Sequence, residues 1–536
     1  MRALGPLALA VLVMLPRLTS AQFGLLDDGL TVQTGREVHG RWASVLHLIP
    51  ETGRFFPAYW LTYSVIWSVV GTRPLAFFVV NAAVLASLLA MLAHLVRLAG
   101  DTRVAVTIAA VAFALSGPAV ESFYTLSKAE PLQLAWIALS LLCTATAAAR
   151  ARGSLGRAGW TAGAGVALLF AHATKETSVV LAPIALGWLV IERRAKPGHP
   201  CAARFAASYL GVAIVSAAAF AVLRWRYAAL PLGEGWYTRA YAFDAATVGP
   251  ALFRIMAWLV RDFAFLLPLV AVGLVRDRTR GPLLYASIWM LGWLAVYLPW
   301  PATFEYYLLP FTLGAAWVAG IVVGDLWRDR AVTPLAWPTL TACALLWVSA
   351  GINAAADARV QLVVDRANGQ LVDVLGGLPR DSRVALNMSP INEYHFELPM
   401  HLVEMKRRPD IAFVRPTTAP GHQGETFLVT PEMANPPRPT VRIALHEAAV
   451  RQDRAMLDGL IASGAAERVY ETTQRVGILE FGIGRLLCRV AVAPILDPTY
   501  CPTERGLIER RTFTYGWQVH RLVHARPIAA TMRHGG

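Results

Sequence analysis

The feature that most constrains this chain is a series of long apolar runs with few charges inside them. One run, LAFFVVNAAVLASLLAMLAHLV at residues 75–96, contains no Asp, Glu, Lys or Arg. A helix of about 20 such residues is long enough to cross the hydrocarbon layer of a bilayer. Only 16% of the residues are charged, against roughly 25% in ordinary soluble domains. The chain is therefore expected to be a polytopic membrane protein and not a soluble globular enzyme.

Eleven apolar stretches before residue 352 predict eleven membrane-spanning helices. Their expected ranges are Ala3–Leu18, Pro74–Leu98, Val104–Val120, Pro131–Ala149, Ala158–Ala173, Thr177–Ile191, Phe205–Leu223, Met256–Val275, Leu283–Leu298, Tyr306–Gly324 and Leu335–Gly351. The first stretch also fits a secretory signal peptide, because Arg2 precedes it and Thr19-Ser20-Ala21 follows it. A retained helix is favoured, and both readings leave residues 22–73 outside the cell interior.

One further stretch is irregular, because Arg254, Arg261 and Asp262 interrupt its apolar pattern. Charges at that depth are costly in lipid. We therefore expect an amphipathic segment at the membrane interface that leads into a shorter span.

Positive charge is distributed so unevenly over the loops that it predicts the orientation of the chain. With the N-terminus inside, alternate loops hold fifteen Lys and Arg but only five Asp and Glu. Such an excess marks cytoplasmic loops. These cations are Arg2, Arg97, Arg103, Arg150, Arg152, Arg157, Arg193, Arg194, Lys196, Arg204, Arg276, Arg278, Arg280, Arg328 and Arg330. Most of the net charge of +14 is then an orientation signal, and no nucleic-acid partner is expected.

The same orientation places a defined set of loops on the outer face of the membrane. They are residues 19–73, 119–130, 224–255 and 299–305, the Lys175-Glu176 step and the whole region after residue 351. Chemistry is expected on this face, in a transmembrane catalytic domain over residues 1–351 and a C-terminal domain over residues 352–536.

The region 352–536 has a different pattern, typical of a soluble α/β domain at the outer face. Short β-type runs alternate with two helical stretches, and 22 basic residues nearly balance 19 acidic ones. The expected strands are 384–388, 411–414, 427–430, 441–445, 476–481 and 487–492, the expected helices 393–406 and 449–463, and a Pro- and Gly-rich loop 415–440. Cys488 and Cys501 can pair in an oxidising compartment, and two free thiols are equally compatible.

Two adjacent carboxylates, Asp27 and Asp28, follow the first predicted span directly. Partial desolvation near a membrane raises the basicity of a carboxylate, so such a pair can serve as a general base or bind a cation. An exposed Asp-Gly turn explains the same residues without any function.

Three more polar clusters lie at the same face. Glu121 is followed by Lys128-Ala129-Glu130, and Lys175-Glu176 lies between two closely spaced spans. Glu305-Tyr306-Tyr307 opens the tenth span. Charges at a membrane boundary are expensive unless they are paired or useful. An interfacial ion pair explains Lys175-Glu176 equally well, and aromatic anchoring accounts for Tyr306 and Tyr307 but not for Glu305.

The order of these features resembles the GT-C class of polytopic glycosyltransferases, which take sugar from a polyprenyl-phosphate carrier. Asp27-Asp28 resembles the acidic motif in the first outer loop of that class, and Gly53-Arg54-Phe55-Phe56-Pro57 is similar to the rest of this loop. Glu121 with Lys128-Ala129-Glu130, Lys175-Glu176 and Glu305–Pro310 resemble motifs of the branch that contains protein O-mannosyltransferase-like enzymes. The departures are Lys128 and Glu305, where Arg is usual, and the lack of a Trp between Ser122 and Thr125.

The resemblance implies transfer of a hexose or pentose from a polyprenyl-phosphate donor to a hydroxyl of a glycan, lipid or protein acceptor, at the outer face of the cytoplasmic membrane. Asp27 is the base that it implies, with Asp28 as the alternate, and a single displacement inverts the anomeric carbon. Cations at the membrane boundary can stabilise the leaving phosphate. The residues expected to bind substrate or lipid phosphate are Arg54, Glu121, Lys128, Glu130, Lys175, Glu176, Glu305 and Tyr306, with Arg224 and Arg226 as further cations.

Three questions stay open at this level. Asp27 and Asp28 suit Mg²⁺ or Mn²⁺, but no His joins them and an unmetallated base is at least as compatible. A transporter or flippase would need charges or helix breaks near mid-membrane and corresponding halves, and such features are lacking apart from Arg261-Asp262. A non-catalytic anchor that presents the C-terminal region would tolerate loss of the outer acids.

Overall fold

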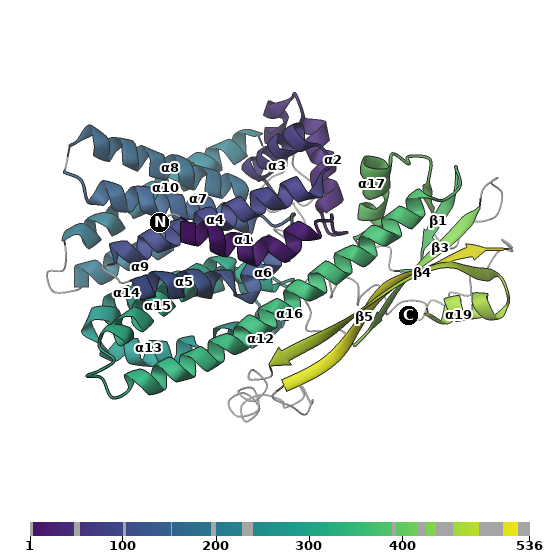
Figure 1. The fold of residues 1–536 in the computed structure, drawn as a ribbon. Coiled ribbons are helices and arrows are strands. Elements are labelled where there is room, and N and C mark those ends of the chain that lie inside the picture. The colour runs from purple at the N-terminus through teal and green to yellow at the C-terminus, as the bar shows by residue number, and fades with distance from the viewer. Residues whose placement is uncertain are drawn as a thin grey trace.

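The computed structural model describes residues 4–47, 54–99, 103–151, 153–194, 200–227, 240–388, 393–414, 425–435, 454–481 and 508–523. Its N-terminal two-thirds form one helical bundle (Figure 1). Seven of the eleven predicted stretches each fall on one helix, and the other four, 104–120, 177–191, 256–275 and 306–324, are each divided between two helical elements. The α-helices of this part are α1 (Leu4–Thr19), α2 (Asp28–Val38), α3 (Pro57–Val70), α4 (Pro74–Leu98), α5 (Arg103–Ala114), α6 (Gly117–Phe123), α7 (Glu130–Ala148), α8 (Leu155–Thr174), α9 (Leu181–Arg194), α10 (Pro200–Tyr227), α12 (Ala245–Phe263), α13 (Leu266–Val275), α14 (Asp277–Tyr297), α15 (Leu309–Arg328) and α16 (Ala336–Gly376). Short 3₁₀ turns are η1 (Trp42–His47), η2 (Glu176–Val180) and η3 (Glu305–Leu308).

Length and apolar composition identify a polytopic membrane fold. In the described part of the chain, five helices are long and apolar enough to cross a membrane, namely α4, α7, α10, η3 with α15, and α16. Up to seven spans result if each of two bent helix pairs counts as one. The count of eleven stays a prediction, because the other helices are shorter or less apolar.

The two bent pairs give the bundle its irregular regions. The α5–α6 pair bends by 60° and the α12–α13 pair by 80°. At the first break the Ser116 side chain accepts a hydrogen bond from the Ala119 N–H at 3.3 Å, which caps α6. At the second, α12 is the segment expected around Arg254 and α13 is the shorter helix that follows. Arg261 and Asp262 at the end of α12 are buried inside the protein and do not lie at a lipid interface.

α16 does not stop at Gly351 as the hydropathy pattern predicts. It runs for 41 residues, and its second half buries Val360, Val364 and Leu371 at helical spacing. This half packs against a five-stranded sheet, so the helix connects the bundle with the C-terminal region (Figure 1). On the sheet, Tyr515 and Trp517 both donate hydrogen bonds to Asn368 Oδ1 of α16, at 2.9 Å each.

The sheet has the strand order β2-β1-β3-β5-β4. β1 (Arg383–Leu386) is parallel to β2 (Ala412–Val414) and to β3 (Thr426–Ala434), whereas β5 (Ile508–Leu522) is antiparallel to β3 and to β4 (Ala466–Phe481). Two helices accompany it, α17 (Tyr394–Lys406) and α19 (Arg454–Ala462). The elements expected at 384–388, 393–406 and 411–414 are present.

Two expectations for this region differ from the structure. β3 and β4 are longer than the runs 427–430 and 476–481, because their backbones pair with β5 along most of its length. β3 passes through Pro431 and therefore interrupts the loop expected over 415–440. The strands expected at 441–445 and 487–492, together with Cys488 and Cys501, lie outside the described residues.

Candidate active site

The two acids of the first outer loop have different environments. Asp27 precedes α2 with a φ of 60°, in the left-handed region that few side chains adopt, and it is half-buried. Asp28 is fully buried, and its Oδ2 accepts a hydrogen bond from the Gly24 N–H at 2.7 Å. Asp28 therefore helps to hold the loop, while Asp27 is the more accessible of the two carboxylates.

Lys128 is a buried cation beside this loop. Only 5% of its surface is exposed, and its Nζ lies 4.5 Å from the centre of the Tyr306 ring. The segment before it is tied to the Asp27 loop, because Ser127 Oγ donates to the Leu26 carbonyl at 2.7 Å. Among the residues that the structure describes, no carboxylate lies within 4.0 Å of the Lys128 ammonium. A buried cation that no described carboxylate contacts directly is costly to keep, so Lys128 is a candidate for binding an anion.

Lys175 lies near Tyr307, the neighbour of Tyr306, as Lys128 lies near Tyr306. Its Nζ pairs with the Glu130 carboxylate and lies 4.3 Å from the centre of the Tyr307 ring. The Tyr306 and Tyr307 rings are 4.3 Å apart. Two lysines from separate parts of the chain thus flank one aromatic pair, with a cation near each ring.

A third group of charges adjoins Lys175. The Glu176 carboxylate accepts a hydrogen bond from the Phe55 N–H at 2.6 Å. It also lies 3.3 Å from Arg224 Nη1 and 3.8 Å from Arg54 Nε. Arg54 is near enough to act electrostatically on Lys175. The first outer loop is therefore attached to the α8–α9 connection through Glu176, and Arg54 is held beside the lysines.

Glu121 and Glu305 help to fix η3, the turn that carries Tyr306 and Tyr307 (the tyrosine turn). Glu121 Oε2 accepts the Tyr306 N–H at 3.0 Å, and Glu305 lies 3.3 Å from Arg261 Nη1. The same guanidinium binds Asp357 of α16 at 2.6 Å. Both glutamates are buried, so each reaches protein groups and not the open side of the site.

Gly117 leaves the space that this arrangement needs. A Cβ atom built on it would lie 1.9 Å from Glu305 Oε1. Any other residue would push Glu305 away from Arg261.

One side of the site comes from α17, which the sequence-based set did not include. Glu397 accepts hydrogen bonds from the N–H groups of Gly29 at 2.8 Å and Leu30 at 3.3 Å. Seven residues further along both helices, Glu404 binds Arg36 at 2.9 Å. Since seven residues are about two helical turns, α2 and α17 run side by side in the same direction (Figure 1). One turn before Glu397, Glu393 is the N-cap residue at the start of α17 and lies close enough to Asp27 for the two carboxylates to act on each other electrostatically.

Glu393 is an exposed residue, but burial of its carboxyl group, and then the nearby Asp27 carboxylate, raise its pKa to about 7, while Lys128 acts in the opposite direction. Burial, and then Asp27, also raise the pKa of Glu397 well above its ordinary value. Burial lowers the pKa of His401 to about 4, so this histidine is neutral near pH 7. In the sequence, the acids at positions 393, 397 and 404 mark one polar face of a predicted helix, but they do not say which segment that face contacts.

The donor set at this site suits a metal poorly. Within the described ranges no three His, Cys, Asp or Glu side chains form a group that could hold a metal ion. Of the two acids expected as ligands, Asp28 already binds a backbone N–H. The described residues of this site therefore do not fit Mg²⁺ or Mn²⁺.

Comparison with known proteins gives fold-level similarity. No family model matches the chain, and no curated protein matches it. ArnT from Cupriavidus metallidurans bound to undecaprenyl phosphate is similar at 14% identity and a TM-score of 0.47, with 95% of this chain and 97% of that chain covered. The Archaeoglobus fulgidus oligosaccharyltransferase tethered with an acceptor peptide is similar at 11% identity and a TM-score of 0.45, with 80% and 69% covered.

A third similar structure is the arabinofuranosyltransferase AftD from Mycobacteria, at 14% identity and a TM-score of 0.45, with 98% of this chain and 41% of that chain covered. These proteins are GT-C glycosyltransferases, the class that the sequence resembles. Similarity at this level carries no conclusion about what this chain binds or does.

Proposed function

We propose that this protein is a glycosyltransferase that moves a sugar from a polyprenyl-phosphate carrier to an acceptor hydroxyl. The proposal is supported by the buried Lys128, which contacts no carboxylate within the described part of the chain and lies beside the loop of the half-buried Asp27, and by Lys175 at the second tyrosine ring. A cation without its own carboxylate fits an anionic leaving group, and a nearby carboxylate fits the proton of an attacking hydroxyl. The resemblance seen in the sequence implies the same base, Asp27, and the chemistry of the leaving phosphate favours the same cation.

Lys128 is assigned to the phosphate of the donor. As the bond from the anomeric carbon to the phosphate oxygen breaks, negative charge grows on that phosphate. Lys128 is in place to stabilise it, with Lys175 and Arg54 adding positive potential. Lys175 already pairs with Glu130, so its ammonium serves mainly to orient the tyrosine pair and the donor. Glu121 and Glu305 act through Tyr306, as positioning residues.

Asp27 is assigned as the general base. It accepts the proton of the acceptor hydroxyl while the hydroxyl oxygen attacks the anomeric carbon, and the polyprenyl phosphate leaves from the opposite side. One such displacement inverts the anomeric configuration. Glu393 then takes the proton from Asp27 and passes it to solvent, because it is exposed and has a pKa near 7. No metal ion enters this scheme, and turnover is expected to survive treatment with a chelator.

The proposed setting is the outer face of the cytoplasmic membrane. The excess of Lys and Arg in alternate loops supports this orientation, with residues 352–536 outside. A hexose or a pentose, and a glycan, lipid or protein acceptor, are all compatible with the residues at the site.

The test is binding and transfer with a matched lysine control. Lys128→Gln is compared with Lys406→Gln, whose ammonium pairs with Asp373 at the far end of α17. We expect the affinity for polyprenyl phosphate to fall at least tenfold in Lys128→Gln, with a parallel loss of sugar transfer, and to be unchanged in Lys406→Gln. Equal affinity in both variants would remove Lys128 from the phosphate site. Donor binding without any transfer in the wild type would favour a transporter or anchor.

A further inference from the structure

An apolar groove lies at the end of the bundle opposite the candidate active site. Its volume is about 370 Å³, and it is formed by α5, α13, α15 and α16. α15 begins just after the tyrosine turn and carries Trp327 of the groove 18 residues later, roughly 27 Å along the helix. The groove is therefore separate from the donor and acceptor site.

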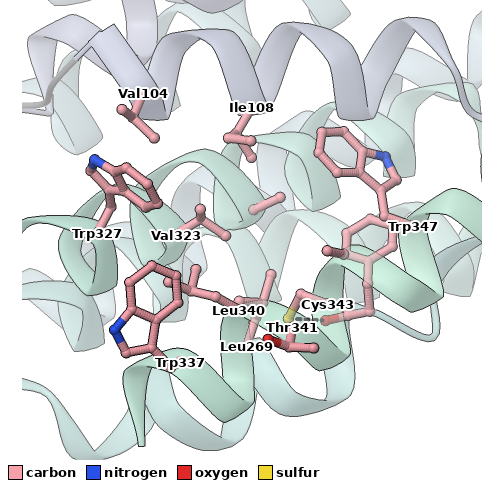
Figure 2. A pocket seen from close by; sticks show the side chains of 13 residues that line it. Val104, Ile108, Leu269, Val323, Trp327, Trp337, Leu340, Thr341, Cys343 and Trp347 are labelled. Carbon is pink, nitrogen blue, oxygen red and sulfur yellow. Dashed lines mark hydrogen bonds between the residues drawn. The ribbon is translucent and has the colours of Figure 1, made fainter. Parts of the chain in front are cut away.

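The shape of the groove follows from the helix breaks. α5 and α13 each belong to a bent pair, so neither continues as a straight neighbour of α15 and α16. The space that they leave is lined by Val104, Ile108, Leu269 and Val323. Figure 2 shows Trp327 and Trp337 at one end of it and Trp347 at the other.

The length of the groove matches one leaflet of a bilayer. Trp337 and Trp347 lie on α16 ten residues apart, which is roughly 15 Å along the helix axis. The hydrocarbon core is about 30 Å thick, so one leaflet contributes about half of that. Trp327 and Trp337, whose rings are 6.1 Å apart, remain 39% and 55% exposed. Tryptophan in this position is typical of the boundary between hydrocarbon and headgroups.

Positive charge surrounds the tryptophan end of the groove. The Arg330 guanidinium lies 4.4 Å over the Trp327 ring and donates to the Trp327 carbonyl at 2.6 Å. Arg103 opens α5 and Arg328 ends α15 at the same end.

Two acids at this end, Asp325 and Asp329, are already paired with arginines. Arg276 binds Asp325 and Asp329 at 2.5 Å each, and Arg278 lies 3.6 Å from Asp329. The described residues around the groove mouth thus carry an excess of positive charge.

We propose that this groove binds one anionic phospholipid of the adjacent leaflet, which the loop charges predict to be the cytoplasmic one. One acyl chain fills the groove between Trp337 and Trp347, and the phosphate lies at Arg330. A basic cluster between helices at the cytoplasmic side is a general device for recognising anionic headgroups. An apolar lining one leaflet deep suits a chain of ordinary fatty-acyl length. The site is independent of the proposed transferase activity.

The test uses the full-length protein in detergent and native mass spectrometry with dioleoyl phosphatidylglycerol and dioleoyl phosphatidylcholine. Ala344→Phe fills the groove, and Leu345→Phe places the same side chain one residue further on, at a position 66% exposed and outside the groove lining. Arg330→Gln removes the cation. The elution volume in size-exclusion chromatography checks that each variant is folded.

We expect the wild type and Leu345→Phe to retain one phosphatidylglycerol at energies that remove phosphatidylcholine. Ala344→Phe should lose this lipid at least tenfold, and Arg330→Gln should bind both lipids equally. Equal retention of the two lipids by the wild type, or full retention in Ala344→Phe, would overturn the proposal. Displacement of phosphatidylglycerol by polyprenyl phosphate at equimolar concentration would also overturn it, since the groove would then hold the tail of the donor.

Discussion

The two ends of the helical bundle treat charge in opposite ways. At the end that carries Asp27, the cations Lys128, Lys175 and Arg261 are buried. At the other end Arg278 is 64% exposed, and Arg276 is only partly buried, although one of the two aspartates that it binds, Asp325, is buried. Surface ion pairs cost little and contribute little, whereas each buried charge costs several kcal/mol to desolvate. On the two proposals made above, the second end uses positive charge for orientation and lipid contact, and the first retains costly charges because the reaction uses them.

The largest effect is expected when Asp27 and Asp28 are replaced one at a time. Asp27→Asn should lower kcat about 10²–10⁴-fold, the usual contribution of a general base, with little change in stability because Asp27 is half-buried. Asp28→Asn should instead lower the free energy of unfolding by about 1–3 kcal/mol, because the buried acceptor of the Gly24 N–H is weakened. Turnover and denaturant unfolding distinguish the two. Undiminished turnover in both variants would remove the proposed base.

The next effect concerns the buried pair of Lys175 and Glu130. Lys175→Met leaves the Glu130 carboxylate buried without its partner, so we expect a loss of stability of about 3–5 kcal/mol. The double variant with Glu130→Gln should recover much of this loss but not the activity. A thermal-unfolding cycle over the four proteins measures the coupling. If the single and double variants were equally stable, the pair would not be isolated from solvent as described.

The third prediction concerns the pH profile. The raised pKa of Glu393 means that its carboxyl group holds a proton below about pH 7. If Glu393 must be ionised to take the proton from Asp27, kcat should fall as the pH drops through 7. Glu393→Gln should lower kcat several-fold and abolish this limb, while Glu393→Asp should restore it. A limb near pH 7 that persists in Glu393→Gln would assign it to another group.

The smallest effect should come from the outer end of the α2–α17 contact. Arg36 is half-exposed, so Arg36→Gln should cost only about 0.2–1 kcal/mol despite the 2.9 Å pair with Glu404. High salt should reduce the difference from the wild type further. A loss above 3 kcal/mol in chemical denaturation would show that this contact, and not the buried end of the bundle, holds α17 in place.

Apolar periodicity predicted the positions of the helices well, because burial in lipid and burial in protein select the same residues. The range of α4 was predicted to the residue. The predicted end of α16 was wrong, since the helix continues past Gly351 and buries apolar residues against the sheet. The sequence also singled out Lys128, Lys175, Tyr306 and Asp27 as candidate residues of one site.

What the sequence could not predict is the contribution of α17. Glu397 and Gly29 are 368 residues apart, and nothing local in either segment encodes their contact. The sequence also could not predict that Asp27 is half-buried whereas Asp28 is fully buried and hydrogen-bonded. It depends on the left-handed backbone at Asp27 and on one N–H group of Gly24.

The central claim is that the charged end of the bundle transfers sugar from a lipid phosphate. Mass spectrometry of the lipids, after incubation of the wild-type protein with a polyprenyl-phosphate sugar and a mixed pool of acceptors, tests it most directly. We expect polyprenyl phosphate to appear in a one-to-one ratio with glycosylated acceptor. A donor that stays intact, or sugar that reaches the acceptor only from a nucleotide carrier, would contradict the account.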